Sequence, residues 1–527
     1  MRQQRILKSV GLVVSFLLLA SLITWPAFAN GNFKTSFDAM VHLTRWESIY
    51  QALKSGQLPP LVNLIGFRQD GAAFTAMYPW LTSLIFILPR FLVGPLAALF
   101  IGFVVLNFLT MVNAYLLSRQ LTNQLSLRLI GVLVYEFGAY HLLDLYSRVD
   151  IGESFAYAFY PLVLLGILRI WHRQGKGGLI LGVGMALMLN SHLLTSVYAT
   201  VIMIIVELVR LLMQRVNWFE IKQFLLAAGI TILGSCYTLV NLIYFILQNQ
   251  LSVPGKTITN VKISLGLIDT IRDQIPNQSS EFNLGLLMFA ILVGLIVISI
   301  FYGGPWRKWI WTGFGIYVFT FLPVDHVPGL AQALYKMQFT GRLYGLVDLL
   351  IMAALVMFLQ QLNWSIRKKW LLAGVVAVLM IVGGVRTSYL YHQKPLDDVN
   401  QFRIHSNRQY RQLVYNLSHS YNYTLESAGE IETGNQVVEQ NATKEVIEVQ
   451  RSQAGRQKLN LSIFKGVYYR VLVNGKSVKV PVGQNLTVNL KSVLNRITIT
   501  TKAPWWNYLT LAITLITWLV LLIIIFY

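Results

Sequence analysis

The stretch of residues 146–171, YSRVDIGESFAYAFYPLVLLGILRIW, joins a charged turn to an apolar run that is long enough to enter a lipid bilayer. Similar apolar runs recur along the 527-residue chain, which is 55% hydrophobic and only 12% charged. A soluble globular protein of this length does not have such a composition. The sequence therefore predicts a polytopic α-helical membrane protein of about 12 crossings. The expected spans are 8–29, 91–118, 126–145, 154–171, 177–191, 194–214, 222–246, 284–302, 307–322, 342–361, 368–388 and 504–526.

The chain is basic, with 43 lysines and arginines against 22 acidic residues. In a membrane protein this excess is explained by cytoplasmic loops that set the topology and by contact with anionic lipids. No basic-aromatic module is present, so we expect no nucleic-acid partner. A single cysteine, Cys236, excludes an internal disulfide, and the scattered histidines make a structural zinc site improbable.

The basic loops set the predicted topology. With the N-terminus inside, the loops at 119–128, 169–176, 215–222, 307–308 and 367–369 all fall on the cytoplasmic side. Residues 74–90 cannot then cross the membrane without inverting every later span, so we interpret them as a re-entrant or surface segment. We expect the first span to be a retained signal anchor, although Ala27-Phe28-Ala29 resembles a signal-peptidase site.

Three parts are predicted along the chain. Residues 1–392 form the multi-span membrane domain, which includes an external loop at 31–75. Residues 393–503 form a small extracytoplasmic β-rich domain, because 467–480 alternates like two strands around an Asn474-Gly475 hairpin turn. Residues 504–527 form the C-terminal transmembrane helix.

The first external loop carries Asp38, His42 and Arg45 at i, i+4 and i+7, which is one face of a helix. That face also carries Ile49 and Leu53, so we expect an amphipathic helix that lies along the membrane surface. A carboxylate and an arginine at the lipid boundary suit chemistry on a lipid-linked phosphate. The alternative interpretation is a solvated loop helix with no function.

Other ionisable residues fall on the same predicted face, and such residues at membrane depth are usually functional. They are Arg148, Asp150 and Glu153 in the opening stretch, His192 at the end of a short span, and Gln338 with Arg342 before a later span. Three of them have a structural alternative: Glu153 could cap its helix, Arg342 could snorkel, and His192 could be a hydrogen-bonded structural histidine. Their convergence on one face favours a site.

An ordered set of motifs carries a resemblance to known families. These are FDAMVHLTRWESIYQALKSGQLPP at 37–60, YP at 78–79, YSRVDIGESFAYAFYPLVLLG at 146–166, NSH at 190–192 and QFTGR at 338–342. The set resembles the bacterial YfhO-like membrane proteins and the "6-pyruvoyl-tetrahydropterin synthase-related" membrane proteins. Those families in turn resemble the GT-C glycosyltransferases.

The resemblance implies a multi-span enzyme that uses polyprenyl-phosphate sugars on the outer face of the membrane. The first-loop acid of GT-C enzymes maps onto Asp38, and their second acidic site maps onto Asp150 or Glu153. The family pattern near Arg342 is closer to Gln-Phe-Pro-Trp-Arg, whereas this chain has Thr340-Gly341 in place of Pro-Trp. The first loop also lacks an Asp-x-Asp pair, which weakens the case for a bound metal.

We therefore expect a glycosyltransferase of the bacterial plasma membrane, with its active face outside and a cell-envelope polymer or glycolipid as acceptor. Asp38 is the expected base, and Asp150 and Glu153 would bind sugar hydroxyls, the acceptor or a divalent cation. The leaving phosphate would bind Arg342, Arg148 or Arg45. His42, His192 and Gln338 complete the expected substrate contacts. The alternatives are a flippase or exporter of a lipid-linked saccharide, and a non-catalytic envelope-assembly protein.

Overall fold

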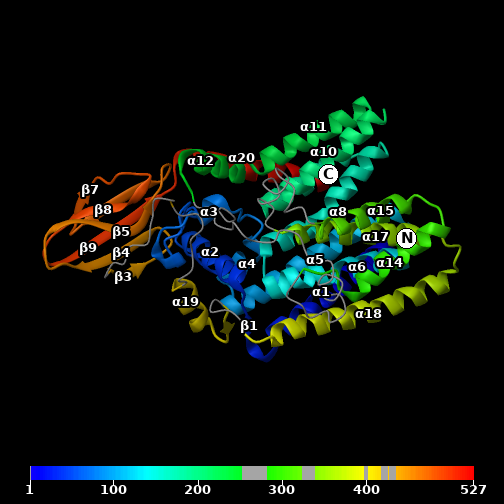
Figure 1. The fold of residues 1–527 in the computed structure, drawn as a ribbon, viewed down its shortest axis with the longest axis horizontal. Coiled ribbons are helices and arrows are strands. Elements are labelled where there is room, and N and C mark those ends of the chain that lie inside the picture. Colours follow the sequence, from blue (N-terminus) through cyan, green and yellow to red (C-terminus); the bar gives the residue numbers. More distant parts are fainter. Residues whose placement is uncertain are drawn as a thin grey trace.

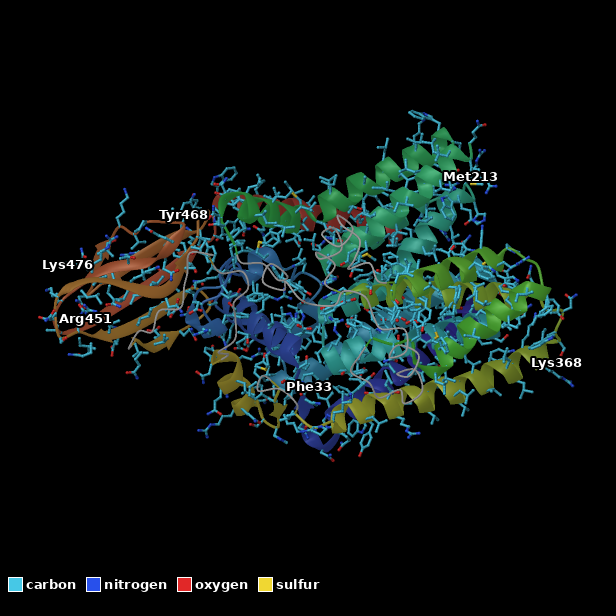
Figure 2. All side chains as sticks on the ribbon, in the orientation of Figure 1. Phe33, Met213, Lys368, Arg451, Tyr468 and Lys476 are labelled. Carbon is cyan, nitrogen blue, oxygen red and sulfur yellow. The ribbon has the colours of Figure 1, made fainter. Side chains whose placement is uncertain are left out.

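The structure is a computed structural model that describes residues 2–251, 282–322, 339–396, 401–416, 425 and 435–526. It has two parts along its longest axis. A bundle of helices forms the larger part, and a β domain lies at one end of it (Figure 1). The turns near Met213 and Lys368 lie at the opposite end, far from Tyr468 and Lys476 of the β domain (Figure 2). The two basic loops 215–222 and 367–369 thus share the end that faces away from the β domain, as the predicted topology requires.

Most of the bundle consists of long apolar helices. They are α1 (Arg2–Thr24), α5 (Pro95–Leu121), α6 (Leu125–Glu136), α8 (Ile151–Trp171), α9 (Gly177–Leu189), α10 (Leu193–Leu212), α11 (Trp218–Gly234), α12 (Cys236–Gln248), α14 (Gly285–Phe301), α15 (Trp306–Phe319), α17 (Tyr344–Gln361), α18 (Ile366–Gln393) and α20 (Trp505–Phe526).

Within the described residues, seven segments are long and apolar enough to cross a membrane, and two bent helix pairs raise that number to nine. The expected spans at 177–191, 284–302 and 307–322 correspond to α9, α14 and α15, which have 13, 17 and 14 residues. A perpendicular crossing needs about 20 residues. The structure therefore supports a multi-span protein with seven to nine candidate crossings, and the count of 12 is not confirmed.

Glycines allow α8, α9 and α11 to pack closely. A Cβ atom on Gly166 of α8 would lie 2.5 Å from the backbone nitrogen of Leu181 in α9, and one on Gly182 would lie 2.7 Å from Ile230 in α11. Small residues at helix contacts are the usual means of close approach between membrane helices. This packing fixes α8 against α9 and α9 against α11.

Two spans are bent. Helix α6 meets α7 (Ala139–Leu142) and the π-helical turn η4 (Leu143–Arg148) at an angle of 44°, and α11 meets α12 at 71°. Asn190 stabilises the second bend: its side-chain amide donates to the carbonyl of Gly234 at 2.9 Å, and its oxygen accepts from the Thr238 hydroxyl at 2.7 Å. Asn190 therefore has a structural role.

The external loop and the segment after it are built from short elements. They are η1 (Trp25–Gly31), β1 (Phe33–Lys34), α2 (Phe37–Lys54), η2 (Phe67–Gln69), α3 (Phe74–Met77), α4 (Leu84–Ile87) and η3 (Leu88–Phe91). In residues 74–90 the helices are only four residues long, which agrees with a segment that does not cross the membrane.

The expected placement of the first-loop helix is wrong. Helix α2 forms over the predicted residues, but most of it is buried: His42, Arg45 and Ile49 are less than 5% exposed, and so are Met40 and Trp46 on the other faces, whereas Asp38 in its first turn stays partly accessible. It is enclosed by the short elements above and by α19 (Asn407–Tyr415), so it is neither a surface helix nor a solvated one. Enclosure by distant segments is not visible in the local hydrophobic pattern.

The β domain is a two-sheet sandwich. One sheet has the order β3-β4-β9-β6-β7 and the other pairs β5 with β8. The strands are β3 (Asn435–Gln440), β4 (Lys444–Gln450), β5 (Gly455–Ile463), β6 (Tyr468–Val473), β7 (Lys476–Val478), β8 (Gln484–Leu490) and β9 (Leu494–Lys502). Asn474 and Gly475 have φ of 50° and 81°, which is the predicted hairpin turn. The core between the sheets includes Leu461, Leu486 and Ile497.

Residues 403–415 precede the sandwich and pack on the helical part. Strand β2 (Arg403–Ile404) pairs with β1, and the Tyr410 hydroxyl in α19 donates to the carbonyl of Leu43 in α2 at 3.3 Å. The sandwich itself therefore begins at β3.

The β domain is seated on the external loop. Leu64 joins the sandwich core, and the backbone carbonyl of Asp70 accepts from the backbone N–H of Ser462 at 2.8 Å. The Asp70 carboxylate also accepts from the Asn460 amide at 2.6 Å. These contacts fix the β domain beside the end of the bundle that carries α2.

Candidate active site

Helix α2 places the first group of the site. Ser36 caps its N-terminus by accepting from the N–H of Ala39, and the Ser36 hydroxyl donates to the backbone carbonyl of Arg148. This joins the first turn of α2, which carries Asp38, to the charged turn 146–153. The Asp38 side chain is surrounded by protein, yet 40% of its surface is accessible, which is the most of any carboxylate in the cluster.

Arg148 is the centre of the site because four carboxylates lie within 4.0 Å of its guanidinium. Its Nη1 is 2.8 Å from Asp144 and 3.3 Å from Glu153, and its Nη2 is 3.5 Å from Asp150 and 4.0 Å from Asp38. The closer contacts leave Nη1 engaged with Asp144 and Glu153. The longer ones leave Nη2 directed toward the accessible side of the cluster.

A sharp turn brings the acids together. Val149 adopts a left-handed conformation with φ of 56°, which reverses the chain between η4 and α8. Asp150 then caps α8 by accepting from the N–H of Glu153 at 3.2 Å. The helix predicted to begin here therefore forms, with Asp150 as its cap.

Tyr78, from the segment 74–90, reaches into the middle of the site. Its hydroxyl donates to the Asp150 carboxylate at 3.3 Å, and its ring lies 5.4 Å from that of His42. Gly152 makes room for it, because a Cβ atom there would lie 2.0 Å from the Tyr78 hydroxyl. Any larger residue at position 152 would displace Tyr78.

Arg45 holds the same segment. Its Nη1 donates to the carbonyls of Tyr78 and Pro79 at 3.2 and 3.1 Å, and its guanidinium lies 4.3 Å from the Tyr78 ring centroid. Its Nη2 also faces Nδ1 of His42 at 3.4 Å. Because arginine can only donate, His42 Nδ1 is the acceptor, and Nε2 carries the proton that faces Asp150 at 3.8 Å.

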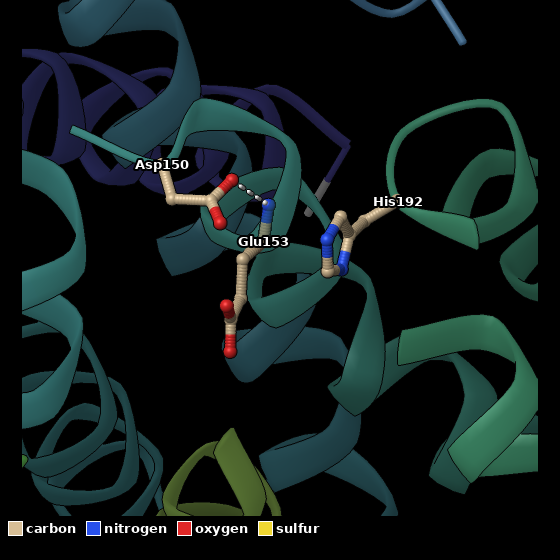
Figure 3. Close-up of side chains that lie close together, drawn as sticks. All are labelled: Asp150, Glu153 and His192. Atoms are coloured by element: carbon tan, nitrogen blue, oxygen red, sulfur yellow. Dashed lines mark hydrogen bonds between the residues drawn. The ribbon is translucent and has the colours of Figure 1, made fainter. Parts of the chain in front are cut away.

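Arg342 and His192 close the other side. Arg342 Nη1 lies 2.6 Å from Glu153, 3.7 Å from Asp150 and 3.4 Å from Nε2 of His192. Figure 3 shows Asp150, Glu153 and His192 converging from two helix N-termini. The Gly341 that departs from the family pattern lies against Phe282, where a Cβ atom would come within 2.5 Å.

The structure brings most of the predicted site residues together. Residues 38, 42, 45, 148, 150, 153, 192 and 342 form one contact network at the end of the bundle next to the external loop. Gln338, the remaining expected site residue, lies outside the described residues.

Three site residues were missed by the sequence analysis. Asp144 binds Arg148 and accepts from Ser154 at 3.1 Å, the Tyr140 hydroxyl donates to Glu153 at 2.5 Å, and Tyr78 contacts Asp150. Asp144 had a usable signal, since an acid within an apolar run is a functional candidate by default. Tyr78 belonged to the YP motif at 78–79 but was not singled out as a site residue, and Tyr140 had no signal, because aromatic residues are common throughout the spans.

The carboxyl groups at the cluster surface differ in acidity. Burial and the nearby Asp150 charge raise the pKa of Asp38 to about 6, against the opposing effect of Arg148. Burial also acts to raise the pKa of Asp150, but the His42 N–H and the nearby His192, Arg148 and Arg342 hold it well below its usual value. Burial lowers the pKa of both His42 and His192, so both imidazoles are neutral at pH 7.

Asp150, Glu153 and His192 are the only such group of possible metal ligands in the described residues; their ligand atoms lie within 4.8 Å of one another. Two carboxylates and an imidazole suit a divalent cation. However, the Arg342 guanidinium already lies 2.6 Å from Glu153 and 3.4 Å from His192. A metal ion would fit only if Arg342 moved away.

The chain matches no known protein-family profile, and it matches no curated protein. Among solved structures it is similar to the arabinofuranosyltransferase AftD from Mycobacteria, with 15% sequence identity and a TM-score of 0.47. That similarity covers 72% of this chain, which spans 28% of the AftD chain. The resemblance to the YfhO-like proteins remains a prediction that rests on its motifs.

Proposed function

We propose that this protein is a membrane glycosyltransferase of the GT-C type, which transfers a sugar from a polyprenyl-phosphate donor to a cell-envelope acceptor outside the plasma membrane. One observation carries the proposal. An accessible carboxyl group, Asp38, lies in the same cluster as the partly buried Arg148 and the buried Arg342, at the end of an apolar bundle beside an external loop.

Asp38 is the proposed base. In the transfer, an acceptor oxygen bonds to the anomeric carbon while the bond from that carbon to the phosphate oxygen breaks, and the acceptor hydroxyl proton must leave. A general base works best when its pKa lies near the operating pH. The pKa of Asp38, raised to about 6, meets that requirement, and Asp38 is also the most accessible acid of the cluster.

The arginines would stabilise the leaving phosphate. Arg148 directs Nη2 to the accessible side through contacts of 3.5 and 4.0 Å, which leave it donors for a phosphate oxygen. Arg342 would act from the opposite side of Asp150. Arg45 is bound to backbone carbonyls, so we now assign it to positioning Tyr78, and we give phosphate binding to Arg148 and Arg342.

A cavity in the bundle offers a place for the isoprenoid chain. It has a volume of about 330 Å³ between α8, α10, α15 and α17, and its lining is mostly apolar. Tyr160 and Leu346, at its edge, follow Glu153 and Arg342 by seven and four residues on the same helices. At about 1.5 Å per residue, the cavity begins roughly 6–10 Å below the cluster.

The test uses purified full-length protein and a panel of radiolabelled polyprenyl-phosphate monosaccharides. Release of polyprenyl phosphate, with transfer of the label to an acceptor or to water, supports the proposal. Asp38→Asn and Arg342→Ala should each abolish release while the protein still inserts and runs as a single species. Glu439→Gln is the matched control and should retain activity, because Glu439 is a similarly exposed carboxylate of the β domain that pairs with Lys444, outside the cluster and the cavity.

Two results would contradict the proposal. Full activity of Asp38→Asn would remove Asp38 as the base. Movement of the lipid-linked sugar across a vesicle membrane, with no bond cleavage by the wild-type protein, would favour the flippase alternative.

A further inference from the structure

A second set of ionisable residues lies deep in the bundle, at the bend between α6 and α7. Glu136 is the last residue of α6, His141 belongs to α7, and Asp348 belongs to α17; all three are fully buried. Glu136 and His141 approach to 4.0 Å between Oε2 and Nε2. None of the three takes part in the Asp38 cluster.

The polar atoms of this set lack hydrogen-bond partners. Both oxygens of Glu136, both ring nitrogens of His141 and one oxygen of Asp348 are buried and unpartnered. The other Asp348 oxygen accepts from the Tyr157 hydroxyl at 3.2 Å, and the Tyr157 ring stacks on His141 with centroids 4.3 Å apart. The residues thus form a continuous chain from Glu136 through His141 and Tyr157 to Asp348.

No arginine or lysine forms an ion pair with Glu136, His141 or Asp348 in the described part of the chain. The other titratable groups near them are tyrosines: Tyr135 on α6, Tyr146 on η4 and Tyr157 on α8. An ionised carboxylate with no cation and no hydrogen bond is very costly in an apolar interior, and such a group takes up a proton instead.

We propose that Glu136 and His141 form a proton-binding site in the membrane domain, at which one exchangeable proton neutralises the Glu136 carboxyl and His141 provides the neighbouring acceptor. The gap of 4.0 Å is too long for a direct hydrogen bond, so the proton moves between the two groups when the bend closes or through an intervening water. This inference is independent of the proposed glycosyl transfer.

The location of the site gives the proton a mechanical role. The Asp348 carboxylate lies against the break between α6 and α7, since a Cβ atom on Gly138 in that break would lie 3.0 Å from it. Loss of the proton would place the negative charge of Glu136 at this bend, among apolar side chains. Helix α7 continues directly into η4, which ends at Arg148, the centre of the Asp38 cluster. A change of the bend on gain or loss of the proton would therefore shift the position of Arg148.

The test is infrared difference spectroscopy on the full-length protein in lipid vesicles near neutral pH. The wild-type spectrum minus that of Glu136→Gln should contain a carbonyl band of a protonated carboxyl group, and that band should shift in D₂O because the proton exchanges. Glu47→Gln is the matched control: Glu47 is equally buried but lies 2.5 Å from Arg90, so its removal should take away no such band.

A second measurement needs no variant. Dicyclohexylcarbodiimide adds to protonated carboxyl groups in apolar surroundings, and mass spectrometry should find the label on Glu136 and not on Glu47. The proposal fails if wild type and Glu136→Gln have the same carboxyl spectrum, if the band does not shift in D₂O, or if the label misses Glu136. The proposal also fails if the carboxyl band is present in a choline buffer and disappears when sodium replaces the choline, because the site would then bind sodium.

Discussion

The bundle contains two groups of buried acids that differ in one respect. Around Asp38, four carboxylates surround Arg148, and Arg342 bridges two of them. Around Glu136, two acids and a histidine lie together without an arginine or lysine paired to them in the described residues. The same kinds of side chain thus lie in two different surroundings, because only the first group has cations that offset the loss of hydration.

The largest expected effect comes from removing the central cation. Arg148→Met leaves four carboxylates without their common partner, so it should abolish glycosyl transfer and lower the free energy of unfolding by about 3–5 kcal/mol. Denaturant unfolding in detergent measures the stability. Arg215→Met, at an exposed position, is the control; equal stability of the two variants would show that the arginines do not hold the Asp38 cluster together.

A substitution in the turn tests whether close packing also holds that cluster. Gly152→Ala drives a methyl group into the Tyr78 hydroxyl, so it should cost about 1–3 kcal/mol and reduce activity by displacing Tyr78 from Asp150. Gly294→Ala, in a membrane helix where the added Cβ atom would meet nothing within 4 Å, is the matched control. If both variants unfold at the same temperature, the tight contact at Tyr78 is unimportant.

The pH dependence should separate the two groups further. The pKa of Asp38 is raised to about 6, and the proposed base acts in its ionised form, so activity should rise with pH and level off above about pH 7. A raised carboxyl pKa also means that this group favours the folded state most when protonated, and that this contribution is lost as pH rises through 6. The His42→Gln variant shows which group titrates. The rise in activity near pH 6 should persist in this variant, and its disappearance would assign the titration to His42.

The smallest effect is expected at the arginine-free group. Asp348→Asn retains an oxygen that can accept from Tyr157 and adds no charge change if the acid is already neutral, so it should alter stability by about 1 kcal/mol or less. Glu153→Gln, which leaves Arg342 without its closest anion, should cost several-fold more in the same unfolding assay. Equal costs for these two variants would remove the distinction between the groups.

Much of the site was accessible from the sequence. The helical spacing of Asp38, His42 and Arg45 and the basic loops together predicted that distant charges would meet at one end of the bundle, and the contact of Arg342 with Asp150 confirms it. The roles of Tyr78, which belongs to the YP motif, and of Tyr140 could not be predicted, since they come from contacts with Asp150 and Glu153 that depend on how the helices pack.

The burial of α2 was likewise beyond local reasoning. The pattern of its apolar and polar residues predicts an amphipathic helix with one exposed face. In the structure, α19 and the segment 74–90 also pack on α2 and cover most of that face. The count of 12 spans is not confirmed, because α9, α14 and α15 are shorter than a full perpendicular crossing.

The sequence by itself determined that this chain is a multi-span helical protein with a late β domain, because apolar runs, alternating strands and an Asn-Gly turn are local properties of the chain. Only the tertiary structure decided which acids are paired with arginines and which are not. The contacts of Arg148 with Asp38 and of Arg342 with Glu153 join residues more than a hundred positions apart, and a one-dimensional pattern contains no distances between such residues.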